Sequence, residues 1–250
     1  MTVVDRNSSS DFDNIRSTSA IPVRSRGMIR FESMIKAHLL HIRKTGGTAV
    51  KHALRNCPAP TYIALWPHNK RLSDISLGEK VVFGVRDPVP RFVSGFNSRL
   101  RMGRPRNNRP WTPEEVRAFA RFKTPNELAE ALSSADPERL EEARRAMLGI
   151  RHVSHPLSQT LGSPEYLRER SDDILMILHQ SDLASDFDAL KRKLCLPPEL
   201  RLPDDETAMH RTPVGFETRL SAIGRRNIET WYEADYAIYR ESLALRDRLL

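Results

Sequence analysis

One short stretch limits what this chain can fold into more than any other, because it combines a strand pattern, a glycine turn and a helix start. Residues 38–48 read HLLHIRKTGGT. The two glycines, Gly46 and Gly47, let the backbone approach a ligand closely and take positive φ without a Cβ penalty. The N–H groups of the following helix start lack partners, and the helix dipole favours negative charge there. Together with the positive charge of Lys44, this stretch predicts a site for a phosphate or a sulfate.

The pattern has a second interpretation, since a Gly-Gly turn between a strand and a helix is common in α/β folds and often binds nothing. Its spacing also differs from the phosphate-binding loop Gly-x-x-x-x-Gly-Lys-[Ser/Thr], because Lys44 precedes the glycines. Thr45 and Thr48 add hydroxyl donors, and either could cap the helix. The anion site therefore needs support from elsewhere in the chain.

The apolar patterns predict an α/β fold with a central parallel sheet flanked by helices. Strands are expected at 36–42, 61–66, 81–85 and 174–178. The continuous apolar run at 81–85 is typical of a central parallel strand. Since ligands bind at the carboxyl ends of such strands, the loops after Ile42, Trp66 and Val85 should meet on one edge of the sheet.

The loop after Val85 supplies a second group of anion-binding side chains. Asp87 is placed to cap the following helix, with Pro88 at the first helical position. Arg86 and Ser94 lie close to that helix start, and an arginine beside a hydroxyl suits a phosphate. Helical spacing predicts a buried face made of Val89, Phe92, Val93, Phe96 and Leu100.

A helical insertion is predicted at about 100–150. Within it, three helix starts share a cap residue followed by proline, at 112–115, 124–127 and 136–138. The first two also carry Glu three residues after Thr, as in a capping box. The insertion is expected to form a lid or a wall of the site. The stretch 99–110 holds five arginines, which either bind an acidic ligand or form a solvated loop.

The remaining chain organisation is simple. A single domain at 35–250 is preceded by a flexible tail at 1–34 that is rich in polar residues. A terminal helix is expected at 221–249, with an aromatic stripe that packs in the core. Cys57 and Cys195 show no metal-ligand spacing and are expected to be free buried thiols. No apolar run reaches the roughly 20 residues of a membrane span, and no signal peptide is recognised.

The charge of the chain indicates the kind of partner it attracts. The formal net charge is +8 and the isoelectric point is near 9.8. Such a surface attracts polyanions, which include nucleic acid, acidic glycans, nucleotide cofactors and anionic lipid. The charge alone does not choose among them.

Two loops together resemble those of a known family. Residues 41–48, HIRKTGGT, resemble the His-x-Pro-Lys-Thr-Gly-Gly-Thr loop of carbohydrate-type sulfotransferases (sulfotransferase family 2-like). Residues 85–96, VRDPVPRFVSGF, resemble the family's Arg-Asp-Pro-x-x-Arg-x-x-Ser-x-Tyr/Phe segment. Similarity continues in LASDF at 183–187 and in a closing Tyr-x-x-Asp-Tyr pattern at 232–236. The resemblance covers about residue 36 to the C-terminus. It implies a P-loop-like three-layer fold that uses 3′-phosphoadenosine 5′-phosphosulfate (PAPS) as donor.

The resemblance also assigns roles to residues. The residues that would hold the 5′-phosphosulfate are Lys44, Thr45, Gly46, Gly47 and Thr48. Arg86 and Ser94 would hold the 3′-phosphate, while Arg211 and Thr212 match a late basic loop that can close over the nucleotide. Arg43 replaces the family's usual proline, which removes a fixed φ and adds a charge that either joins the phosphate site or points to solvent. Ser181 replaces a frequent glutamate.

The implied reaction is in-line transfer of a sulfuryl group to an acceptor hydroxyl on a carbohydrate or glycoconjugate. Lys44 and the loop N–H groups would stabilise the leaving phosphate. His68 is the preferred general base, because it follows the second strand and related 2-O-sulfotransferases place a histidine in this region. His152 and His155 are its rivals, whereas His38 and His41 are expected to be structural. No metal is implied, since no cluster has ligand spacing.

Two other functions remain open from the sequence. An ATP-dependent kinase with an atypical phosphate loop would need a carboxylate for Mg²⁺, and Asp87 is the obvious choice. A non-enzymatic polyanion-binding module would use the arginines of 99–110. The paired loops favour the sulfotransferase, with an acidic glycan among its candidate acceptors and no specific nucleic acid partner. A cytoplasmic location is expected.

Overall fold

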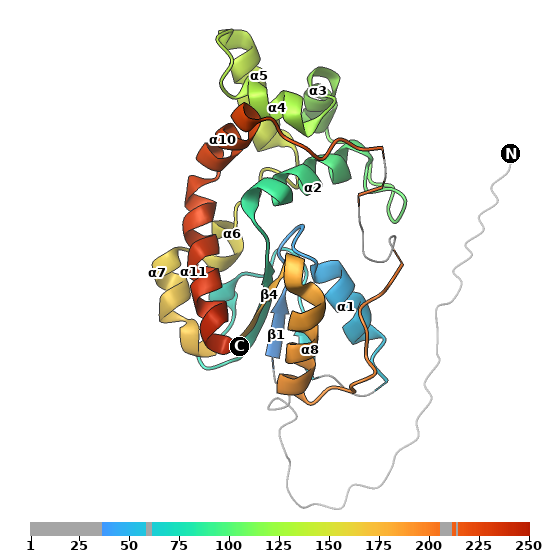
Figure 1. Cartoon of the computed structure of the whole chain (residues 1–250), viewed down its shortest axis with the longest axis vertical. Coiled ribbons are helices and arrows are strands. Elements are labelled where there is room, and N and C mark those ends of the chain that lie inside the picture. The colour runs from blue at the N-terminus through green and yellow to red at the C-terminus, as the bar shows by residue number, and fades with distance from the viewer. Residues whose placement is uncertain (1–36, 59–61, 206–211, 214) are drawn as a thin grey trace, which may run out of the picture. The chain divides into compact units, whose positions relative to one another are not determined.

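The computed structural model describes residues 37–58, 62–205, 212–213 and 215–250, and it contains a four-stranded parallel sheet (Figure 1). The strands are β1 (Ala37–Leu40), β2 (Ile63–Leu65), β3 (Val81–Val85) and β4 (Ile174–His179), in the order β2-β1-β3-β4. All three pairings are parallel. The predicted α/β class is therefore confirmed. The first two strands are shorter than expected and end before the residues that line the site.

Helices α1 (Gly47–Arg55) and α8 (Leu183–Leu194) cover one face of the sheet. Side chains alternate along a strand, so one set faces these helices. This set includes Leu39, Val82 and Met176, which share a core cluster with Val50 of α1 and Phe187 of α8. The apolar spacing of α8 was predicted correctly, because its four expected core positions are all buried.

The opposite face is covered by α6 (Ser158–Leu161), α7 (Pro164–Glu169) and α11 (Glu233–Leu249). Leu40, Phe83 and Ile177 point toward this layer. Short 3₁₀ turns, η2 (Leu72–Asp74), η3 (Ser171–Asp173) and η4 (Gln180–Asp182), flank the strands. The described chain thus forms three layers, with the sheet in the middle.

A third core cluster joins α2 (Pro88–Leu100) to the helical insertion. The insertion consists of α3 (Pro113–Arg121), α4 (Pro125–Ala131) and α5 (Pro137–Gly149), and α10 (Ala222–Trp231) packs against it. The predicted caps are confirmed at Thr112, Thr124 and Asp136, each of which accepts a backbone N–H of the first turn. The full capping box forms only at Thr112, because Glu127 instead accepts the N–H of Lys123. The insertion is therefore a packed helical unit that continues from α2.

Three other expectations have different outcomes. The terminal helix is not continuous, since it breaks at Tyr232 into α10 and α11. The expectation of buried thiols is wrong, because Cys57 is half-buried and Cys195 is exposed. The predicted tail at 1–34 lies outside the described residues. Across those described, no helix combines the length and apolar character that crossing a membrane requires.

Candidate functional site

A cleft with a volume of about 1090 Å³ opens at the carboxyl edge of the sheet. Each of the four strands sends residues to it from the loop that follows: His41 and Arg43 after β1, His68 after β2, Arg86 after β3 and Gln180 after β4. The volume is slightly above the roughly 300–1,000 Å³ that is usual for small-molecule sites. The prediction that the strand loops meet on one edge is confirmed.

Two positions of the loop between β1 and α1 favour glycine, Gly46 through its backbone conformation and Gly47 through a close neighbouring side chain. Gly46 is the N-cap of α1 with φ 88°, and a Cβ there would lie 2.7 Å from a methyl group of Leu183. A Cβ on Gly47 would lie 2.6 Å from the ring of His41. Lys44 also has a positive φ of 67°, an uncommon conformation for a residue with a side chain.

The carbonyl groups of this loop are turned into the protein. The hydroxyl of Thr45 donates to the Ile42 carbonyl at 3.0 Å, and Arg91 Nε donates to the Arg43 carbonyl at 3.2 Å. The Lys44 carbonyl accepts from Arg86 Nη1 at 3.5 Å, at the limit for a hydrogen bond. Within the described chain, the N–H groups of residues 44–48 donate to no backbone carbonyl. These N–H groups are therefore available to an anion.

The two threonines of the loop differ in their placement. Thr45 is buried and its hydroxyl is engaged by Ile42, so its side chain does not line the cleft. Thr48, in the first turn of α1, does line it. The expectation that one of them caps α1 is wrong, because the N-cap is Gly46 and makes no side-chain cap hydrogen bond.

Lys44 and Arg86 are desolvated cations that face the same cleft. Burial, and then the charges of Arg101 and Arg86, lower the pKa of Lys44 to about 7. Burial lowers the pKa of Arg86 to about 10, with Asp87 opposing the shift. Arg86 Nε is buried without a hydrogen-bond partner in the described part of the chain. An anion bound beside each of these groups would supply the counter-charge that the protein does not provide there.

The described lining of the cleft is strongly basic. It contains no Asp or Glu, whereas its lysines and arginines are Arg43, Lys44, Lys51, Arg55, Arg86, Arg99, Arg106, Arg109 and Arg151. Among these, Arg99 is neutralised by Glu115, which holds it in a bidentate pair at 2.6 Å for both bonds. A cleft of this kind concentrates anions.

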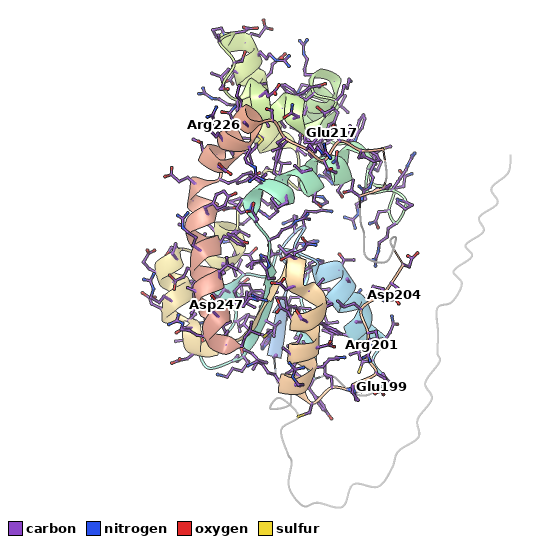
Figure 2. All side chains as sticks on the ribbon, in the orientation of Figure 1. Glu199, Arg201, Asp204, Glu217, Arg226 and Asp247 are labelled. Carbon is purple, nitrogen blue, oxygen red and sulfur yellow. The ribbon has the colours of Figure 1, made fainter. Side chains whose placement is uncertain are left out.

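Most residues predicted for the site are brought together here. The predicted residues that line the cleft are Arg43, Lys44, Gly46, Gly47, Thr48, His68, Arg86, Ser94 and Thr212. Arg211 lies outside the described residues. Thr218 also lines the cleft, because the segment after residue 214 runs beside α2, where Asn97 donates to the Glu217 carbonyl at 2.7 Å (Figure 2).

The ring of His68 lies against the ring of His41, with centroids 3.8 Å apart and planes inclined by 33°. His68 Nδ1 lies 2.7 Å from the His41 carbonyl, and since a carbonyl only accepts, Nδ1 carries the proton. This tautomer leaves the lone pair on Nε2, as a general base requires. Burial lowers the pKa of His68 to about 4 and that of His41 to about 2, so both rings are neutral at pH 7.

The rival histidines lie in the same cleft. Burial, followed by the charge of Lys44, lowers the pKa of His152 well below its usual value, and its Nδ1 has no partner in the described chain. His155 Nδ1 lies 3.3 Å from the Ser154 hydroxyl. His38 does not line the cleft, because it is buried and accepts the Trp66 indole N–H at 2.9 Å. The structural role expected for His38 is confirmed.

The arginine-rich stretch 99–110 fits neither interpretation as a whole. Arg99 and Arg101 are buried, and Arg99 forms part of the cleft wall. Arg106 and Arg109 are exposed side chains that line the cleft, whereas Arg104 is exposed and does not line it. The basic face of α1 was missed from the sequence. Thr48, Lys51 and Arg55 lie three and four residues apart, a spacing that places them on one helix face.

The tyrosines of the last helices, expected from the sequence to pack in the core, also hold loops of the site. The Tyr232 hydroxyl donates to the Val153 carbonyl at 2.6 Å, beside His152. The Tyr236 hydroxyl donates to Asp87 Oδ1 at 3.1 Å, and the same oxygen accepts the Val89 N–H at 2.8 Å. The Asp87 carboxylate is thus committed to capping α2.

Comparison with known proteins gives no family assignment: no family model matches the chain, and no curated protein matches it.

Proposed function

We propose that this chain is a PAPS-dependent sulfotransferase with a P-loop-like fold, acting on an acceptor hydroxyl. One observation carries the proposal. The loop 43–48 and the pair Arg86 and Ser94, separated by more than thirty residues in sequence, line a single basic cleft whose described walls hold no carboxylate. A nucleotide with anionic groups at both ends suits two anion sites in one cleft.

The residues present fit such a donor. The glycines at 46 and 47 keep the loop clear of Cβ atoms, and the loop N–H groups are free of backbone acceptors in the described chain. In this proposal they hold the 5′-phosphosulfate together with Lys44. Arg86, whose Nε has no partner among the described residues, and Ser94 hold the 3′-phosphate. Arg43 lines the cleft instead of pointing away from it, which adds a cation to the donor site.

The chain's own groups then divide the catalytic work. PAPS, when bound, supplies the sulfuryl group that the acceptor oxygen receives. His68 accepts the acceptor proton at Nε2, since its Nδ1 proton is fixed by the His41 carbonyl. Lys44 and the loop N–H groups stabilise the negative charge that develops at the phosphate end of the cleft. No covalent intermediate with the protein is needed, because positioning and charge stabilisation suffice for in-line transfer.

The kinase alternative is less well supported by the geometry. It required Asp87 as a magnesium ligand, yet Asp87 Oδ1 already accepts from Val89 and Tyr236, and the residue does not line the cleft. The binding-module alternative relied on the arginines of 99–110. Arg99 is paired with Glu115 there, which leaves fewer free charges for a polyanion.

Calorimetry and a transfer assay together test the proposal. The desulfated product 3′-phosphoadenosine 5′-phosphate (PAP) should bind at least tenfold more tightly than ATP with Mg²⁺. Incubation with labelled PAPS and a panel of glycans, glycolipids and small alcohols should label at least one acceptor. Arg86→Gln should lose both signals, whereas Arg226→Gln, on the exposed surface of α10 (Figure 2), should keep them. Tighter binding of ATP with Mg²⁺, or binding of heparin that Arg86→Gln leaves unchanged, would contradict it.

A further inference from the structure

We propose that Arg91, locked in place by Asp235, is a positioning residue that holds the donor loop and the loop of His152 and His155 at a fixed separation. This inference rests on the proposed function, since it assigns a task to a residue that supports the same cleft. Arg91 itself does not line the cleft. It acts through backbone groups of residues that do.

The three nitrogens of the Arg91 guanidinium donate hydrogen bonds to three different segments of the chain. Nε donates to the Arg43 carbonyl at 3.2 Å, in the loop between β1 and α1. Nη2 donates to the His155 carbonyl, in the loop after the helical insertion. Nη1 donates to Asp235 Oδ2 at 3.0 Å, on α11. The side chain of Arg91 is 3% exposed, so water does not compete for these bonds.

Asp235 completes the arrangement from the C-terminal helix. Its side chain is 2% exposed, and its second oxygen, Oδ1, accepts the Leu157 N–H at 2.8 Å. The carboxylate therefore binds both Arg91 and the segment that follows His155. A planar guanidinium with fixed N–H directions can hold two loops at a defined distance, which a lysine cannot do.

The contact with Arg43 has a direct consequence for the anion loop. A peptide unit is planar and trans, so fixing the Arg43 carbonyl also fixes the direction of the Lys44 N–H. Lys44 has a positive φ, which costs free energy and persists only where the surrounding structure enforces it. Arg91 supplies that enforcement from outside the cleft. Without it the N–H groups of the loop would lose the alignment that binds an anion.

The chain contains a matched control at the other edge of the sheet. Arg170 is also 3% exposed and pairs with Asp173, while its remaining N–H groups donate to the carbonyls of Leu72 and Ile75. Asp173 Oδ1 accepts the Gly78 N–H at 2.9 Å. Both arginines thus bind one aspartate and loop carbonyls, two for Arg91 and three for Arg170, which also donates to the Ser76 carbonyl. Of the two, only Arg91 reaches residues of the cleft.

The experiment compares two double variants, Arg91→Met/Asp235→Asn and Arg170→Met/Asp173→Asn, with the wild type. Each removes a buried pair without leaving an unpaired charge, and each asparagine keeps an acceptor for the backbone N–H. PAP affinity is measured by calorimetry below the unfolding transition, and hydrogen exchange is followed by mass spectrometry. Arg91→Lys is measured in parallel, because it keeps the charge while losing the planar fork.

The Arg91 double variant should bind PAP at least tenfold more weakly, and peptides covering 41–48 and 152–157 should exchange at least tenfold faster. The Arg170 double variant should bind PAP as the wild type does, and only its peptides covering 72–78 should exchange faster. Arg91→Lys should follow the Arg91 double variant in direction. Unchanged exchange in both cleft loops, or equal loss of PAP affinity in the two double variants, overturns the inference. If the wild type does not bind PAP, the proposed function fails, while the exchange comparison still decides the role of Arg91.

Discussion

Binding of PAP should draw a proton onto Lys44. Burial beside Arg101 and Arg86 lowers the pKa of this lysine to about 7, so at pH 8 only about one tenth of it is charged in the free protein. A bound phosphate supplies the missing counter-charge and returns the pKa toward its usual range near 10. Binding at pH 8 should therefore take up about 0.9 of a proton.

Calorimetry measures this uptake directly. PAP is titrated at pH 8 in buffers of different ionisation enthalpy, and the slope of the binding enthalpy against that enthalpy gives the number of protons. In Lys44→Met the number of protons taken up should fall by about 0.9. In Lys193→Met, at an exposed position on α8, it should be unchanged. Burial also lowers the pKa of Lys51 to about 8, so a smaller uptake can persist in Lys44→Met. The histidines of the cleft do not contribute, since their pKa values are lowered and they stay neutral.

The charge of Lys44 also determines the sign of the pH dependence of PAP binding. The protonated lysine binds the anion, so PAP affinity should be level below pH 7 and fall by up to tenfold per pH unit as the pH rises above it. An uptake below about 0.2 of a proton in the wild type, or the same uptake in Lys44→Met, would refute the reasoning.

Three further outcomes are expected. His68→Asn should lower kcat by about 10²–10⁴ with little change in PAP affinity, and the acid limb of the wild-type kcat/KM profile should appear as the pH drops through about 4; a wild-type kcat in this variant would exclude His68 as the base. Arg86→Gln should abolish the preference for PAP over adenosine 5′-phosphate, which lacks the 3′-phosphate. Competition binding measures this preference, and a preference retained in the variant would contradict the assignment of Arg86 to the 3′-phosphate. Gly47→Ala should weaken PAP binding and lower the free energy of unfolding by about 1–3 kcal/mol, because its Cβ meets the ring of His41; chemical denaturation with an unchanged midpoint would contradict this.

The elements predicted best from the sequence are those whose signals are local. The run at 81–85 and the helix start at Asp87 and Pro88 depend on neighbours in sequence, and the structure has both as predicted. The loop 43–48 also reaches the cleft, because a strand followed by a glycine turn leaves few alternatives. These features could be predicted because each depends on residues that are close together in the sequence.

The features missed from the sequence depend on contacts between distant residues. Arg91 and Asp235 are 144 positions apart, and no spacing rule connects them. The inward turn of Thr45 follows from the close approach of Gly84, where a Cβ would lie 2.9 Å from the Thr45 carbonyl. The break at Tyr232 is accompanied by its hydrogen bond to Val153, a tertiary contact that helical periodicity does not report.

The central claim is that one cleft binds the two ends of the same nucleotide, and a crystal structure of the chain with PAP tests it most directly. The account predicts the 5′-phosphate on the N–H groups of residues 44–48 with Lys44, and the 3′-phosphate on Arg86 and Ser94. It also predicts His68 Nε2 facing the space beyond the 5′-phosphate. A complex in which either phosphate lies outside the cleft, or in which PAP does not bind at millimolar concentration, would contradict the account.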